Sequence, residues 1–181
     1  MTGANAANDI SASNRKLTFV LGGARSGKSS HAETLVTASA APWTYIATAQ
    51  AYDEEMRERI ALHRSRRGEG WTTVDASLDL AGAIEALPDH RPVLVDCLTL
   101  WLTNHMLADR DIEAECRRLA DILSRPRGPW FVVSNEVGLG IVPDNALARR
   151  FRDAAGRLNQ QVAAVADNVL MMVAGLPLKV K

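Results

Sequence analysis

The sequence contains 181 residues, of which 47% are hydrophobic and 23% are charged, enough for one soluble domain with a sizeable core. Its 21 basic and 21 acidic side chains balance, so no global charge indicates a nucleic acid or an anionic membrane as the partner. Any basic site must therefore be local.

The first 16 residues are small and polar, and we expect residues 1–16 to form a disordered extension. They lack the apolar centre of a signal peptide, and the absence of arginine before Arg15 argues against a transit peptide. No apolar run approaches the roughly 20 residues that a membrane-spanning helix needs. We therefore expect a cytoplasmic protein without a membrane span, with residues 17–181 forming a single domain.

Short apolar runs alternate with helical segments along the rest of the chain. Strands that are apolar throughout, with helices between them, are typical of a mostly parallel sheet covered on both faces. The last short run follows a Gly-Leu-Pro turn, and we expect it to be antiparallel. The predicted strands are 17–21, 44–48, 71–74, 92–96, 130–134, 169–173 and 178–180, and the predicted helices are 29–40, 53–66, 78–87, 112–123 and 145–167.

The residues after the first strand match the phosphate-binding motif G-x-x-x-x-G-K-[ST], in the strand-to-helix context that the motif requires. Backbone N–H groups and the helix N-terminus would hold the β- and γ-phosphates, Lys28 would add a positive charge, and Ser29 would ligate Mg²⁺. The alternative is a chance glycine-rich turn. We expect an α/β fold of the P-loop NTPase (RecA-like) class. The motif comprises Gly22, Gly23, Ala24, Arg25, Ser26, Gly27, Lys28 and Ser29.

Asp96 ends the apolar strand 92–96 and is predicted to be the second protein ligand of the magnesium ion. The alternative is an ordinary turn residue at the end of a strand. We interpret Cys97 as a small buried residue, since nothing in the sequence indicates that the pKa of its thiol is lowered. Cys97 and Cys116 lack CxxC spacing, so neither a disulfide framework nor a zinc site is indicated.

The predicted helix 53–66 is densely charged, with acidic residues in its first turn and basic residues at its end, which suits the helix dipole. Nearby guanidinium groups would keep His63 neutral and nucleophilic near pH 7 and would stabilise charge on a phosphoryl group. Spacing alone equally allows a solvated helix with an incidental histidine.

Four segments resemble the family of bifunctional adenosylcobinamide kinase / adenosylcobinamide-phosphate guanylyltransferases of cobalamin biosynthesis. They are GGARSGKSSHAE, YIATAQAYDEEMRERIALHRSRRGEGW, VLVDCLTLWLTN and SNEVGLGIVPDNALARRFRDAAGRLNQQVAAVADNV. Many families share the phosphate loop, whereas the whole set in this order is specific. The likeness extends from about Leu17 to Lys181.

The resemblance implies two reactions and a homotrimer. An enzyme of this kind phosphorylates the aminopropanol hydroxyl of adenosylcobinamide with ATP or GTP, using Mg²⁺. It then transfers GMP from GTP to that phosphate, with release of pyrophosphate. The resemblance also implies that the transfer passes through a covalent GMP-histidine, which the motif HRSRRGEGW assigns to His63.

The resemblance further assigns nucleotide contacts outside the phosphate loop. One of them is usually a glutamate after the strand at 71–74, and the shorter Asp75 at this position makes that contact less secure. Guanine specificity rests on the resemblance alone, because the sequence has no Asn-Lys-x-Asp motif. His31 is interpreted as structural, and His90 and His105 as residues near turns. The assigned contacts are Ala47, Thr48, Ala49, Arg64, Ser65, Arg66, Arg67, Asp75 and Asp96.

The two reactions attack different phosphorus atoms, the γ-phosphorus in the kinase step and the α-phosphorus in the transfer. We therefore expect two nucleotide poses or two subsites, which a neighbouring subunit could complete. Asn135 could sense the γ-phosphate and Glu136 could orient or deprotonate the hydroxyl, because ligand-binding residues follow the strands of open α/β sheets. Alternatively, Ser134, Asn135 and Glu136 merely shape a tight loop.

Two other functions remain open at this point. A kinase for another small molecule would use Lys28, Ser29 and Asp96 and leave His63 idle. A nucleotide-dependent switch would act on a protein partner, although the chain has no long insertion to recruit one.

Overall fold

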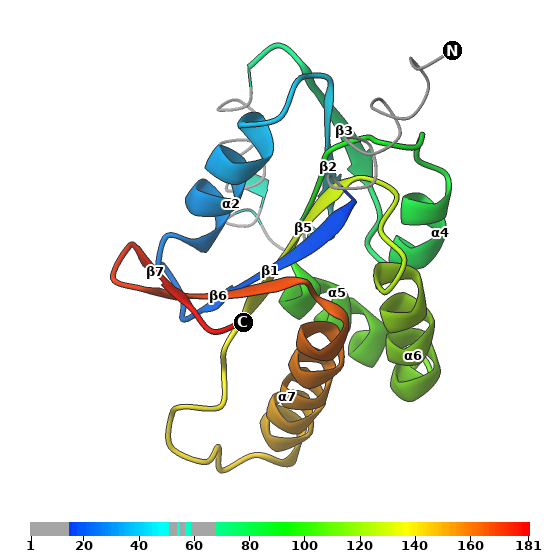
Figure 1. Ribbon diagram of the computed structural model, residues 1–181. Helices are drawn as coiled ribbons and strands as arrows, with labels where there is room; N and C mark the ends of the chain where they lie inside the picture. The colour runs from blue at the N-terminus through cyan, green and yellow to red at the C-terminus, as the bar shows by residue number, and fades with distance from the viewer. Residues whose placement is uncertain (1–14, 51–53, 55–56, 59–67) are drawn as a thin grey trace, which may run out of the picture.

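The protein was analysed as a computed structural model, which describes residues 15–50, 54, 57–58 and 68–181. Its centre is a seven-stranded sheet with the order β3-β2-β4-β5-β1-β6-β7 (Figure 1). Every neighbouring pair is parallel except β6 with β7, which confirms the predicted mostly parallel sheet and its antiparallel last strand. The strands are β1 Lys16–Gly22, β2 Trp43–Ala47, β3 Trp71–Asp75, β4 Val93–Asp96, β5 Pro129–Asn135, β6 Asn168–Val173 and β7 Leu176–Lys179.

Helices cover both faces of the sheet, and this explains why the central strands are apolar throughout. On β1, Phe19 faces a core shared with Trp101 and Leu158, while Val20 belongs to a second core with Val36. In Figure 1, α2 lies on one side of the sheet and α5, α6 and α7 lie on the other. The helices are α2 Lys28–Thr37, α4 Leu80–Glu85, α5 Leu98–Leu107, α6 Ile112–Leu123 and α7 Ala146–Val165.

Helix α5 is absent from the prediction. Its sequence, LTLWLTNHML, directly follows the apolar strand β4 and is itself hydrophobic on several faces, so no amphipathic period marks it. Trp101 and Leu102 are buried, which accounts for this composition. The helix turns out to be central to the site described below.

Several predicted boundaries shift for local reasons. The helix expected over 78–87 begins only at Leu80, because the Asp79 carboxylate caps it by accepting a hydrogen bond from the Gly82 N–H. The expected Gly-Leu-Pro turn is wrong: the turn is Ala174-Gly175, both with positive φ, and Leu176 already belongs to β7.

Most of the helix expected over 53–66 lies outside the described residues. None of the helices in the described part of the chain is long and apolar enough to cross a membrane.

Candidate functional site

Five parallel strands bring the predicted site segments to one edge of the sheet. Ala47 at the end of β2 is in register with Asp75 of β3 and with Asp96 of β4, and Gly22 of β1 is in register with Asn135 of β5. Carboxyl ends of parallel strands are where open α/β sheets bind ligands. The fold therefore brings together loops that are far apart in the sequence.

The loop after β1 has the backbone that a phosphate cradle needs. Gly22 has φ +154°, and a Cβ there would lie 2.6 Å from the Ser26 hydroxyl oxygen and 2.7 Å from the Met172 carbonyl oxygen. Gly27 has φ +92° and immediately precedes α2. Glycine is required at both positions, because a side chain would clash at the first and strain the backbone at the second. The loop thus places its N–H groups at the start of a helix, where anions bind.

Lys28 lies inside this loop. Its side chain is only 7% exposed, and its ammonium group donates hydrogen bonds to the Gly23 carbonyl and, at 3.5 Å, to the Ser26 hydroxyl. Burial lowers the pKa of Lys28, whereas the negative charges that Cys97 and Asp96 can carry raise it. A buried ammonium group at a helix N-terminus is suited to neutralising phosphate oxygens.

The ends of β2 and β4 are joined through Thr48. The Thr48 hydroxyl donates to the Cys97 carbonyl at 2.7 Å and accepts from the Cys97 N–H at 2.8 Å, and the Thr48 N–H donates to the Asp96 carbonyl at 3.3 Å. The residue is completely buried. These bonds fix the backbone beside the Asp96 carboxylate, so Thr48 acts on the site through the geometry of its neighbours.

The Cys97 thiol is buried beside Asp96. Burial, together with the Asp96 charge, raises the pKa of Cys97 to about 11. The thiol is therefore protonated and inert at neutral pH, which confirms the interpretation of Cys97 as a small buried residue. Cys116 is also buried, and burial raises the pKa of its thiol to about 11 as well.

We expect iodoacetamide at pH 8 to alkylate neither thiol in the folded protein and both in guanidinium chloride, because only the exposed thiolate reacts. Mass spectrometry of the two samples measures this. A Cys97→Ser variant identifies which thiol is modified first as the pH is raised toward 11. Rapid alkylation of native Cys97 at pH 8 would contradict the buried, protonated state.

The segment after β5 is held from three sides. The Asn135 N–H donates to the Thr99 hydroxyl at 2.8 Å, the Asn159 amide donates to the Asn135 carbonyl at 3.2 Å, and the Glu136 N–H donates to the Gly22 carbonyl at 3.0 Å. One Glu136 carboxylate oxygen accepts the Gly138 N–H at 2.6 Å, which supports the loop-shaping alternative. The other carboxylate oxygen of Glu136 stays a candidate for contact with the substrate hydroxyl that the predicted kinase step phosphorylates.

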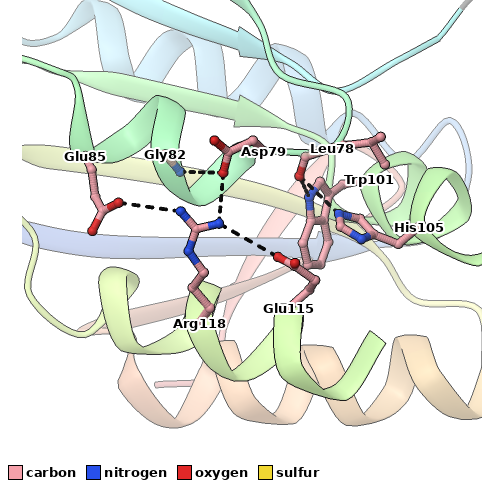
Figure 2. Close-up of polar contacts among 8 residues, drawn as sticks. All are labelled: Leu78, Asp79, Gly82, Glu85, Trp101, His105, Glu115 and Arg118. Carbon is pink, nitrogen blue, oxygen red and sulfur yellow. Dashed lines mark hydrogen bonds and ion pairs between the residues drawn. The ribbon is translucent and has the colours of Figure 1, made fainter. Parts of the chain in front are cut away.

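Sequence reasoning missed the polar side chains of α5. Asn104 is buried and donates to the carbonyls of Thr48, at 2.8 Å, and Ser77, at 2.9 Å. His105 lies in the last turn of α5, close to the turn at 108–109 as predicted, but its side chain is buried. Its ring is tilted by 57° against that of Trp101, with the ring centroids 4.4 Å apart, and a ring nitrogen lies 3.0 Å from the Leu78 carbonyl oxygen (Figure 2). The available signal was a pair of polar residues, Asn-His, inside an apolar run.

Asp75 lies at the far end of the row of strands. It ends β3, which is four places from β1 in the sheet order. At the usual spacing of strands this is about 19 Å from the phosphate loop, too far for Asp75 to touch a phosphate held there. The candidate contacts therefore spread along the edge of the sheet formed by the carboxyl ends of its strands.

Five further candidate residues lie outside the described residues, in the connection from β2 to β3. They are His63, Arg64, Ser65, Arg66 and Arg67.

The described residues contain no group of three or more His, Cys, Asp or Glu side chains that could hold a metal ion. Ser29 in the first turn of α2 and Asp96 at the end of β4 supply two oxygen donors, and α2 packs against β4. Mg²⁺ commonly takes one or two protein oxygens and completes its shell with phosphates and water. The donor set fits that kind of ion.

Comparison with known proteins gives a consistent result. Residues 18–180 match the family described as cobinamide kinase / cobinamide phosphate guanyltransferase. The bifunctional adenosylcobalamin biosynthesis protein CobP of Pseudomonas aeruginosa is 47% identical over 166 residues, covering 90% of this chain and 96% of that protein. The bifunctional adenosylcobalamin biosynthesis protein CobU of Escherichia coli is 42% identical over 179 residues, covering 90% of this chain and 98% of that protein.

Solved structures share the fold at low sequence identity. The RadB recombinase has a TM-score of 0.52 and 18% identity, over 94% of this chain and 82% of its own. The PH0250 protein of Pyrococcus horikoshii has a TM-score of 0.51 and 12% identity, over 93% of this chain and 87% of its own. At these identities the likeness shows the fold alone, and that fold is the P-loop NTPase class predicted from the sequence.

Proposed function

This chain belongs to the cobinamide kinase / cobinamide phosphate guanyltransferase family, and from that premise we propose that its second reaction passes through GMP bonded to His63. It is a bifunctional enzyme of cobalamin biosynthesis, a kinase and a nucleotidyltransferase. The observation that carries the assignment of the nucleotide site is the buried Lys28 ammonium group, enclosed by the phosphate loop and beside Asp96.

In the kinase step, Lys28 and the N–H groups of the loop hold the phosphates of ATP or GTP. Ser29 and Asp96 hold Mg²⁺, which neutralises charge on the phosphate oxygens when it is bound. The aminopropanol hydroxyl of adenosylcobinamide loses its proton to the other carboxylate oxygen of Glu136, and the hydroxyl oxygen bonds to the γ-phosphorus. The bond from that phosphorus to the leaving oxygen breaks, and most of the rate enhancement comes from placement and charge.

In the transfer step, a neutral His63 nitrogen bonds to the α-phosphorus of GTP and pyrophosphate leaves. An oxygen of adenosylcobinamide phosphate then bonds to the same phosphorus, the phosphorus–nitrogen bond breaks, and His63 is regenerated. Two substitutions at an activated phosphorus replace one slow transfer. The product is adenosylcobinamide-GDP.

The two reactions use different poses or subsites along the strand ends. What supports this is the length of the edge: Ala47 and Asp75 end strands that are three and four places from β1, and the connection carrying His63 joins these two strands. Structures with GTP and with the covalent GMP would test it. The same guanine and ribose position in both would refute it.

The expected result for the covalent step is protein-bound label from GTP labelled at the α-phosphate. Purified enzyme is incubated with Mg²⁺ and GTP, then denatured. A phosphorus–nitrogen bond to histidine is acid-labile and base-stable, so the label should survive alkali and be lost in acid. A His63→Ala variant should take up no label while it still phosphorylates adenosylcobinamide.

GTP labelled at the γ-phosphate is the matched control, since its label leaves with pyrophosphate. Adenosylcobinamide phosphate should discharge the labelled wild-type enzyme. Label that persists in the His63→Ala variant would place the covalent bond on another residue. No label in the wild-type protein would refute the GMP-histidine, and only the kinase reaction would remain assigned to this site.

We also infer a homo-oligomer, a trimer by the family resemblance, working in the cytoplasm. Exposed large apolar side chains support the oligomer, because extensive exposed apolar surface commonly marks an interface. They lie in the loop after β5, at Leu139 and Ile141, and on the edge strand β7, at Leu176 and Leu178.

A further inference from the structure

The hairpin formed by β6 and β7 extends past the end of β1 and reaches the phosphate loop. Strand β6 runs parallel to β1, and its Met172 is in register with Gly22, the last residue of β1. The chain then turns back at Ala174 and Gly175. In Figure 1, the tip of this hairpin lies beside the segment that joins β1 to α2. A segment from the C-terminal end of the chain therefore borders the loop that is predicted to hold phosphate.

Two backbone contacts join the tip of the hairpin to the phosphate loop. The Gly175 N–H donates a hydrogen bond to the Ser26 carbonyl at 3.1 Å. A Cβ on Gly27 would lie 3.3 Å from the Gly175 Cα, which is tighter than ordinary van der Waals contact, so the two glycines meet backbone to backbone. No side chain takes part, and the geometry of the contact is set by the two backbones alone.

The hairpin does not use the Gly175 N–H to form its own turn. Val173 pairs with Leu176, so Ala174 and Gly175 make a two-residue turn, and their φ values are +51° and +83°. Positive φ at both central residues is typical of a type I′ turn. The hydrogen bond of such a turn joins its first and fourth residues, and the N–H of the third residue is left to bond elsewhere.

The bond to Ser26 also determines the direction of the next N–H group. In a planar trans peptide the C=O and the N–H point in opposite directions, so a Ser26 carbonyl held toward the hairpin turns the Gly27 N–H away from it. A flip of this peptide would carry φ of Gly27 from +92° into the negative range, which glycine populates about as readily. Glycine at this position makes the flip easy, and the Gly175 bond opposes it.

Other carbonyl groups of the loop are held from outside in the same way. The Gly22 carbonyl accepts the Glu136 N–H at 3.0 Å, and the Gly27 carbonyl accepts the His31 N–H at 3.0 Å. A backbone concavity binds an anion when its successive N–H groups point inward together. The bond from Gly175 is the contribution of the C-terminal hairpin to this arrangement.

We propose that Gly175 is a positioning residue for nucleotide binding, whose N–H keeps the Gly27 N–H directed at the phosphates. The inference rests on the proposed function, in which the phosphate loop holds the phosphates of ATP or GTP in the kinase step. Gly175 itself is assigned no contact with the nucleotide and acts through the Ser26–Gly27 peptide.

The test replaces the Ala174–Gly175 peptide bond by an ester in the full-length chain, made by ligating a synthetic C-terminal segment. The ester removes the N–H donor and leaves every side chain in place, and the same ligated chain with the normal amide is the control. We expect the KM for ATP in the phosphorylation of adenosylcobinamide to rise about 3- to 10-fold, the usual net effect of one hydrogen bond. The kcat should stay within about twofold, because the loop holds phosphate equally in the ground state and the transition state.

A pair of substitutions tests the same bond if the ligated chain does not refold. Gly175→Val puts a β-branched residue at φ +83°, a strongly disfavoured conformation, so the turn should rearrange, move the N–H away from Ser26 and raise the KM for ATP similarly. Gly175→Asn is the matched control. Asparagine tolerates positive φ, and a Cβ at position 175 meets no atom within 4 Å, so this variant should keep the wild-type KM.

Two further measurements separate positioning from damage elsewhere. The KM for adenosylcobinamide and the mass of the native assembly, from light scattering, should be unchanged in the ester protein. The inference is overturned by a KM for ATP less than about threefold above that of the amide protein, by a fall in kcat as large as the rise in KM, or by an equal loss in Gly175→Asn. An affinity for ATP that Lys28→Ala leaves unchanged would instead overturn the placement of the nucleotide in the phosphate loop.

Discussion

Replacing Lys28 by alanine is expected to lower the kinase rate by about 100- to 1000-fold, the usual cost of losing one preorganised group that stabilises developing charge. The ammonium group is buried within the phosphate loop, so no other side chain can take its place without rearrangement. Steady-state phosphorylation of adenosylcobinamide measures the effect. Labelling of the variant by α-labelled GTP then shows whether the two reactions share the phosphate loop. If GTP binds to the same loop in both reactions, the variant loses labelling as well. If guanylyl transfer uses a separate subsite, the variant keeps it.

The thermal stability of the Lys28 variant is the control. Burial lowers the pKa of Lys28, so the unfolded chain binds that proton more tightly than the folded protein does. The resulting penalty acts on the folded state at pH 7 and disappears only as the pH rises through the usual lysine range. Removing the charge should therefore not destabilise the nucleotide-free protein through this group. A kinase rate within tenfold of wild type would contradict the assigned role.

Replacing Asp96 by asparagine is expected to lower the kinase rate by about 100-fold or more at low Mg²⁺, because a charged ligand of the ion becomes a neutral one. Titration with Mg²⁺ should show a higher concentration for half-maximal activity. The matched control is Asp121→Asn, which removes an exposed carboxylate of α6 that is paired with Arg125 and is not part of the candidate site. Unchanged Mg²⁺ dependence in the Asp96 variant would exclude the carboxylate as a ligand.

The same variant has a second consequence that requires no nucleotide. The Asp96 charge raises the pKa of both Lys28 and Cys97, so its removal should lower both. Alkylation of Cys97 should begin at a lower pH in Asp96→Asn than in the wild-type protein. The high-pH limit of residual kinase activity should likewise shift downward as Lys28 loses its proton earlier. An alkylation profile identical to that of the wild-type protein would contradict the electrostatic coupling.

The sequence alone determined the features that depend on local order. The phosphate loop was recognisable because strand, glycines, lysine and helix follow one another without interruption, and its two strained glycines, Gly22 and Gly27, occupy the positions that the motif requires. The parallel sheet was predictable because strands buried on both faces are apolar throughout. The position of Asp96 at the end of such a strand was also predicted and is confirmed, whereas its role as a magnesium ligand stays a prediction.

Only the tertiary structure decided how these parts are combined. Sheet order puts β3 four places from β1, and nothing in the local sequence records that separation between Asp75 and the phosphate loop. Helix α5 was missed because it is buried on several faces and therefore has no amphipathic period. Its polar residues Thr99 and Asn104 gain meaning only when their backbone partners, 36 and 56 residues away in the chain, lie beside them. Hydrogen bonds over such separations arise from packing, which local sequence patterns do not encode.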